Sequence, residues 1–236
     1  LQMARRTVVL GLVVGVVIAA GVVGVPFLKQ VTTQWSLGGA GFVVNWQLDS
    51  ENWMTGGVTE AKYKGNSWMK ASPDADLLML PKLWNLESLS LQECAVTAKG
   101  LAPLSRLNRL RELNLSRMNH IRYGVGPTGL SDACLVPIQG LTSLERLTLS
   151  GNRITDAGLA KLAGLSNLET LDLDATDVTD AGLVHLHALA NLKTVDLAGT
   201  KVTLQGVKAL QAALPGLDIN VEMDPDLAEK VREWRR

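Results

Sequence analysis

Three aspartates in the second half of the chain have the type and spacing that best suit metal chemistry. Asp172 and Asp174 are two residues apart, and Asp196 lies in the next stretch where apolar and polar residues alternate. Such alternation predicts β-strands whose outward side chains line one face of a sheet. Carboxylate oxygens gathered on that face are suitable ligands for a hard cation. The three residues are therefore candidates for a cation site or for a surface that binds a partner.

Residue patterns typical of enzymes are missing from this sequence. His185 and His187 are two positions apart in a predicted helix, which places them on roughly opposite sides, so they do not form an HExxH-type metal pair. No nucleophile elbow, Walker loop or CxxC pair occurs. Residues 124–129 match G-x-G-x-x-G, but the match contains Pro127 and lacks the strand-to-helix context of a dinucleotide site. We therefore expect a protein that is not an enzyme.

A basic segment with the sequence RMNHIRYGVG, Arg117–Gly126, is the main candidate for contact with a partner. Segments inserted between repeats often lie on one surface and bind ligands. This one has no acid and contains a tyrosine, which suits an acidic protein, an anionic polymer or lipid headgroups. The alternative is a tolerated loop without a role. The predicted partner-binding residues of the chain are Arg117, His120, Arg122, Tyr123, Arg146, Asp172, Asp174 and Asp196.

These residues are positioned by a recurring unit, plainest in LTLSGNRITDAGLAKLAGLSN and LDLDATDVTDAGLVHLHALAN. In the second of these units, Leu171 and Leu173 alternate as in a strand, whereas Leu183, Leu186 and Leu189 have helical spacing. A unit this short cannot bury its own apolar face, so neighbours must stack into a solenoid. Thr179 and Asp180 precede the helical stretch, and either side chain is suited to cap it. The predicted units start at Val58, Leu86, Leu110, Leu144, Leu168 and Leu192, with a partial unit at Leu217.

At these residues the chain resembles the leucine-rich repeat family, in the bacterial subtype that reads LxxLxLxxTxVTDAGLxxLxxL. The resemblance covers roughly Val58 to Val221. It implies an α/β solenoid shaped as a curved horseshoe, with parallel strands on the concave face and short helices on the convex face. An Asp after the second leucine of the strand is common in this family, so we expect neither a metal nor a cofactor at the aspartates. The family's ladder of stacked side chains falls on Asn66, Cys94, Thr128, Asn152, Thr176 and Thr200.

Residues 7–28 contain no charged side chain and are long enough to cross a bilayer. Arg5 and Arg6 precede this segment, which by the positive-inside rule predicts a cytoplasmic N-terminus, with the repeats in the periplasm or outside the cell. The alternatives are a cleaved signal peptide ending near Ala19-Ala20, which would give a secreted protein, and a buried core segment. The predicted organisation is therefore an anchor at 1–28, a juxtamembrane segment and N-terminal cap at 29–57, repeats at 58–223 and a capping helix at 224–236.

The two cysteines do not make a disulfide framework in a chain of 236 residues. Cys94 falls on the predicted ladder, and Cys134 replaces the glycine of the TDAGL motif. We expect two small buried residues with inert thiols; a disulfide between them would need a local distortion.

Charge is balanced overall, with 23 Lys and Arg against 23 Asp and Glu, but it is unevenly distributed. Residues 82–153 have nine basic and five acidic residues, whereas 154–200 have two basic and seven acidic residues. A dipolar surface steers partners without naming them. Taken with the resemblance, we predict a membrane-anchored scaffold that binds a protein. The alternatives are an envelope protein that binds glycan or an anionic polymer and, less favoured, a substrate-recognition subunit. We expect no nucleic-acid partner.

Overall fold

The computed structural model describes residues 34–36, 42–46, 58–63, 74–78, 80, 85–92, 96–116, 130–221 and 225–235. All of them fall in one compact unit made of Thr33–Trp46 and Gly57–Arg236. The other unit, Leu1–Thr32 with Gln47–Gly56, lies outside the described residues, and the predicted membrane segment 7–28 lies within it. In the described part of the chain, no helix has the length and apolar character needed to cross a membrane.

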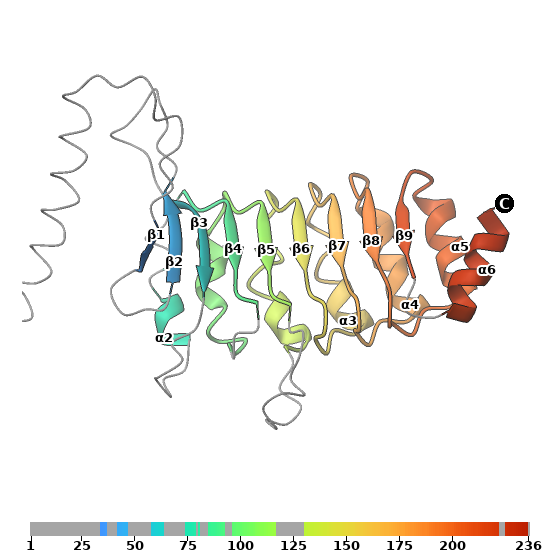
Figure 1. The fold of residues 1–236 in the computed structure, drawn as a ribbon, viewed down its shortest axis with the longest axis horizontal. Coiled ribbons are helices and arrows are strands. Elements are labelled where there is room, and N and C mark those ends of the chain that lie inside the picture. The colour runs from blue at the N-terminus through green and yellow to red at the C-terminus, as the bar shows by residue number, and fades with distance from the viewer. Residues whose placement is uncertain are drawn as a thin grey trace, which may run out of the picture. The chain divides into compact units, whose positions relative to one another are not determined.

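Nine strands form a single sheet in which the strands follow one another in sequence order (Figure 1). β1 and β2 pair antiparallel, as do β2 and β3, and every later pair is parallel. The described helices lie behind and below this row of strands and beyond its C-terminal end. The strands are β1 (Gln34–Ser36), β2 (Phe42–Trp46), β3 (Val58–Tyr63), β4 (Ser88–Ser90), β5 (Glu112–Asn114), β6 (Arg146–Thr148), β7 (Thr170–Asp172), β8 (Thr194–Asp196) and β9 (Asp218–Asn220).

Strand pairing confirms the predicted repeat register for all units but the last. The residues equivalent to Ser88 in β4 are Glu60, Glu112, Arg146, Thr170, Thr194 and Asp218. The last step, from Thr194 to Asp218, is therefore 24 residues rather than the predicted 25. Gly216, not Leu217, is equivalent to Leu192. The apolar pattern pointed to Leu217 because that leucine is itself buried, one position later than in the other repeats.

Short helical segments return the chain from one strand to the next. The leucines predicted from helical spacing, Leu183, Leu186 and Leu189, are all buried, as are Leu159, Leu162 and Leu165 at the equivalent positions of the preceding repeat. α6 covers the C-terminal end with Leu227 and Val231, as predicted for a capping helix. The helices are α2 (Asp74–Leu77), α3 (Asp156–Leu159), α4 (Asp180–Leu183), α5 (Leu204–Ala213) and α6 (Pro225–Arg235), with 3₁₀ helices at Ala102–Arg106, Asp132–Leu135 and Val184–Ala188.

A continuous core runs through the solenoid from Leu77 to Val231. Each strand from β4 to β9 contributes one central residue that points into this core, such as Leu113 in β5 or Val195 in β8, while its neighbours point outward. Burying a leucine contributes about 1.5–3 kcal/mol. Because each leucine is covered partly by the repeat before and partly by the repeat after, the repeats stabilise one another.

Carboxylates on the helical side link successive repeats. In each case one Asp oxygen accepts a hydrogen bond from the backbone N–H of a Thr in the next repeat, at 2.7–2.9 Å, and the other accepts from the hydroxyl of the same Thr, at 2.5–2.7 Å. We call these contacts the Asp–Thr bridges. They correct the expectation that Asp180 caps its own helix, because its carboxylate bonds Thr203, while the hydroxyl of Thr179 accepts from the N–H of Ala181. The four bridges are Asp74–Thr97, Asp132–Thr155, Asp156–Thr179 and Asp180–Thr203.

The Asp–Thr bridges explain the glycine of the TDAGL motif. A Cβ atom added to Gly206 would lie 2.1 Å from the carboxylate of Asp180, and equivalent contacts occur at Gly100, Gly158 and Gly182. The one described repeat of this kind without the glycine supports this explanation. Cys134 stands at the glycine position, and the preceding repeat has Ala98 where Asp132, Asp156 and Asp180 stand in the next three repeats. Because Ala98 has no carboxylate to place next to this position, the larger side chain of Cys134 fits there.

The predicted ladder is partly described. Asn152 is buried and joins two repeats: its Nδ2 donates to the carbonyls of Leu115 and Leu149, and its Oδ1 accepts from the N–H of Leu130. Thr176 and Thr200 instead donate their hydroxyls to the carbonyl three residues earlier in their own repeat. A hydroxyl is shorter than an amide and carries one polar atom rather than two, so it does not reproduce the bridge. Asn66, Cys94 and Thr128 lie outside the described residues.

We expect Gly206→Ala to lower the free energy of unfolding by about 1–3 kcal/mol, because the new methyl group overlaps the Asp180 carboxylate. Gly140→Ala is the matched control, since a Cβ there meets nothing within 4 Å, and it should be neutral or slightly stabilising. Denaturant unfolding followed by circular dichroism measures both changes. The double variant Asp180→Ala with Gly206→Ala should cost less than the sum of its parts; simple additivity would contradict the steric explanation.

Candidate functional site on the strand face

The outward side chains of β4 to β8 form a polar surface, which we call the strand face. Pairing confirms the predicted order of two of its rows, one running from Ser88 to Thr194 and the other from Ser90 to Asp196. The neighbouring row follows each strand. The three rows are Ser88, Glu112, Arg146, Thr170 and Thr194; Ser90, Asn114, Thr148, Asp172 and Asp196; and Gln92, Ser116, Ser150, Asp174 and Ala198.

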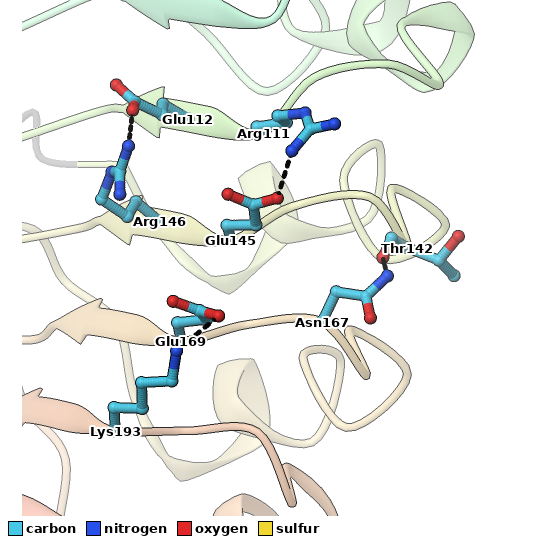
Figure 2. Close-up of polar contacts among 8 residues, drawn as sticks. All are labelled: Arg111, Glu112, Thr142, Glu145, Arg146, Asn167, Glu169 and Lys193. Atoms are coloured by element: carbon cyan, nitrogen blue, oxygen red, sulfur yellow. Dashed lines mark hydrogen bonds and ion pairs between the residues drawn. The ribbon is translucent and has the colours of Figure 1, made fainter.

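The basic side chains on and just beside this surface form ion pairs with glutamates of adjacent strands (Figure 2). Arg111, just before β5, contacts Glu145 at 2.7 Å, and Lys193, just before β8, contacts Glu169 at 2.7 Å. Arg146 on β6 forms an ion pair with Glu112 on β5. All of these side chains are partly exposed to solvent, so each pair contributes at most about 1 kcal/mol.

The pairing leaves the strand face acidic. Arg146 on the strand face, and Arg111 and Lys193 just before it, are each balanced by a glutamate, whereas Asp172, Asp174 and Asp196 remain without a cationic partner among the described ion pairs. Arg146 was predicted to contact a partner, but its guanidinium already lies on the Glu112 carboxylate. Sequence reasoning missed Glu112, Glu145 and Glu169. The missed signal is opposite charge at the same position of adjacent repeats, which neighbouring strands must bring together.

Two of the aspartates also shape the ends of their strands. One carboxylate oxygen of Asp172 accepts from the N–H of Asp174, at 3.0 Å. Asp196 does the same with the N–H of Ala198, at 2.9 Å, and its other oxygen accepts from the amide of Asn220, at 2.8 Å. Such Asx turns are a local structural use of Asp. The other oxygen of Asp172 remains for contact with a partner.

Asp174 has the most unfavourable environment of the three. Burial raises the pKa of its carboxyl, and the negative charges of Asp196 and Asp172 raise it further. Its Oδ1 is buried and has no hydrogen-bond partner in the described structure. The adjoining backbone is also unusual, because Ala175 has a left-handed φ of 52° where the next repeat has Gly199. A cationic group from a partner would relieve the repulsion at this point.

Metal binding by these carboxylates is not supported by their arrangement. In the described residues, no group of three or more His, Cys, Asp or Glu side chains is placed to hold a metal ion. The basic segment of the sequence prediction, with Arg117, His120, Arg122 and Tyr123, lies outside the described residues. Its role stays a prediction.

The Cys134 thiol is free and fully buried. Burial raises its pKa to about 12, the nearby Asp132 carboxylate adds to the increase, and a backbone hydrogen bond lowers it slightly. Because the thiolate is the reactive form, this side chain is an inert part of the core.

We expect Asp174→Asn to stabilise the protein at pH 7. A raised pKa means that the folded state binds the proton more tightly than the unfolded chain, so the ionised carboxyl destabilises the fold above that pKa and the cost disappears as the pH falls through it. The difference in Tm between variant and wild type should therefore be positive at pH 7 and shrink near pH 3. Asp218→Asn, which removes the same charge from an exposed position on β9, should change Tm less.

In a Cys94→Ser background, Cys134 should not react with a disulfide reagent at pH 8 while the protein is folded, and should react at once in denaturant. Absorbance of the released thiolate measures both states. Rapid labelling of the folded protein would contradict the buried, high-pKa thiol.

Known sequence families agree with this geometry. A family profile described as Leucine Rich repeats (2 copies) matches residues 142–182, and a second, described as Leucine Rich repeat, matches residues 85–105 and 188–210. Together with the parallel sheet and its regular register, these matches show that the chain contains leucine-rich repeats. No curated protein matched the sequence at a significant level.

Two similar solved structures are internalins from Listeria monocytogenes. The internalin inlF is 26% identical with a TM-score of 0.47, and the match covers 60% of this chain and 36% of that protein. Internalin C2 (inlC2) is 26% identical with a TM-score of 0.44, and the match covers 69% of this chain and 70% of that protein. The chain thus spans little more than a third of the length of inlF.

Proposed function

We propose that this leucine-rich repeat protein is a protein-interaction module and that the strand face binds a partner with a basic, polar surface. One observation supports the proposal. The cations on and beside the face form ion pairs with glutamates of neighbouring strands, whereas Asp172, Asp174 and Asp196 have no cationic partner among the described ion pairs. The parallel sheet holds these carboxylates on consecutive strands, which limits the entropy lost when a partner binds.

The strand face is suited to a reversible, charge-guided contact. Its outward residues are short and polar, and no aromatic side chain occurs in the three rows. Tight protein interfaces are usually centred on Trp, Tyr or Arg, so the anchoring side chains should come from the partner. Complementary charge chiefly increases the rate of association and weakens with added salt.

A binding role is also favoured over the other functions considered. Leucine-rich repeat domains act typically as interaction modules, and the arrangement of the described acids and histidines offers no metal-assisted chemistry. An anionic polymer is a poorer match to the strand face, because Arg111 and Arg146 are neutralised by Glu145 and Glu112. The bacterial 24-residue subtype of the repeat remains part of the proposal.

We further propose that residues 7–28 anchor the repeats outside the cytoplasm; the support is the uncharged sequence and the arginines before it. Protease added to intact spheroplasts should digest the repeats if this orientation is correct. Protection of the repeats until lysis would contradict it, and full release into the medium would indicate a cleaved signal.

The strand-face proposal is tested by photo-crosslinking from Thr170, an outward residue of β7. We expect one protein to be captured, and the double variant Asp172→Asn with Asp196→Asn to reduce capture about tenfold because two charges are lost while their amide oxygens can still accept hydrogen bonds. Glu229→Gln on α6 is the matched control for loss of charge and should capture normally.

Equal capture by the double variant and the wild type would contradict contact through these carboxylates. A version lacking Arg117–Gly126 tests the second contact predicted from the sequence, because capture should fall if that segment binds the same protein.

A further inference from the structure

The helical segments of five consecutive repeats present a second surface, opposite in character to the strand face. The equivalent eight-residue segments are 99–106, 133–140, 157–164, 181–188 and 205–212. In each of them the third and sixth residues are buried leucines, valine or isoleucine, and the second is a buried glycine or cysteine. The first, fourth, fifth, seventh and eighth residues are exposed or half-buried, as expected for the outer side of a helical turn. We call this outer surface the helical face.

An apolar row runs along the middle of the helical face. The fourth residue of each segment is apolar in four repeats, and the equivalent residue in the repeat before them is Leu78. The larger side chains of this row are well exposed: Leu78 by 70%, Val136 by 50% and Val184 by 59%. Contiguous exposed apolar side chains mark interaction sites more often than ordinary surface. The row reads Leu78, Ala102, Val136, Ala160 and Val184, and ends at Lys208.

The charges on the helical face are all positive. Its 25 positions include no Asp or Glu, but they include three lysines, one arginine and two histidines. The acids closest in sequence, such as Asp156 and Asp180, are held in the Asp–Thr bridges. Within the described residues none of the four cations forms an ion pair, although Lys161 donates to the carbonyl of Ala157 and Lys208 lies 5.6 Å from the ring centroid of Trp234. The four cations are Lys99, Arg106, Lys161 and Lys208.

We propose that the helical face is a docking surface for an acidic amphipathic helix of a protein partner. The exposed valines and leucine supply the apolar contact, and alanines and glycines on both sides of the row, such as Ala157 and Gly164, let a helix backbone approach closely. The unpaired cations match carboxylates that flank an apolar stripe. This mode of recognition is helix packing rather than binding to the edge of a sheet.

Charge argues for this occupant over two others. A second copy that presented the same face would bring cations against cations, which is unfavourable. An anionic bilayer would attract the cations, but the exposed side chains are mostly alanine and glycine, which bury little area in lipid. The proposal is independent of the strand-face contact, because the two surfaces share no residue.

Fluorescence anisotropy of the full chain with a labelled model peptide tests the proposal. The probe is an alanine-rich peptide of about 20 residues with leucines along one stripe and glutamates flanking that stripe, a composition and length that favour helix in water. We expect saturable binding that weakens with salt. Val184→Glu with Val136→Glu should weaken it about tenfold or more, and these exposed positions tolerate the change without unfolding, as circular dichroism will verify.

Two controls keep the result specific. Asp172→Asn on the strand face should leave peptide binding unchanged, and a peptide with lysines in place of the glutamates should not bind. The proposal is overturned if the acidic peptide does not bind, or if the two valine substitutions leave its affinity unchanged.

Two competing occupants are measured in parallel. Preferential binding to vesicles of phosphatidylcholine with phosphatidylserine would overturn the proposal and identify a bilayer as the occupant of the helical face. Self-association seen by analytical ultracentrifugation and abolished by Val184→Glu would also overturn the proposal and identify a second copy of the chain as the occupant. Because the strand-face test uses Asp172 and Asp196, failure of either proposal leaves the other open to its own test.

Discussion

The structure depends on one constraint: a single repeat is too short to bury its own leucines. Each leucine is covered in part by the repeats before and after it, so the core is continuous from Leu77 to Val231 and the strands must align in parallel at a fixed register. Side chains at equivalent positions then lie in rows, whatever their chemistry. The polar strand face, the acid-free helical face and the inter-repeat hydrogen bonds all result from that alignment.

Contacts between neighbouring repeats give the rows their local chemistry. On the helical side, a carboxylate from one repeat satisfies the N–H and hydroxyl of a Thr in the next, and it lies so close to the residue three positions after that Thr that glycine is favoured there. On the strand side, glutamates neutralise Arg111, Arg146 and Lys193. The net effect is a separation of charge between two faces, with unbalanced acids on one and unpaired cations on the other. The two contacts proposed above both rest on this distribution of charge.

More of the fold than of the candidate site could be predicted from the sequence. Leucine spacing was enough for the repeats, the strand rows and the capping helix, because apolar periodicity directly reports which side of an element is buried. It failed by one residue at Leu217, where a buried leucine occurs beside the expected position. For the candidate site, the sequence singled out Asp172, Asp174, Asp196 and Arg146 as partner-binding residues, and these stay predictions. It did not show that Arg146 pairs with Glu112, because a pairing between residues 34 positions apart is visible only once β5 and β6 are aligned.

The sequence by itself thus determined the period, the core residues and the polarity of each position within a repeat, since those depend on short-range spacing and side-chain type. The tertiary structure alone decided which charges neutralise each other and which remain. The difference in charge between the two faces appears only in the folded chain, because stacking places equivalent residues of neighbouring repeats side by side and puts the strand and the helical segment of one repeat on opposite sides. Electrostatic and hydrogen-bonded partners are chosen by distance in space, and distance in a solenoid is set by the packing of the core.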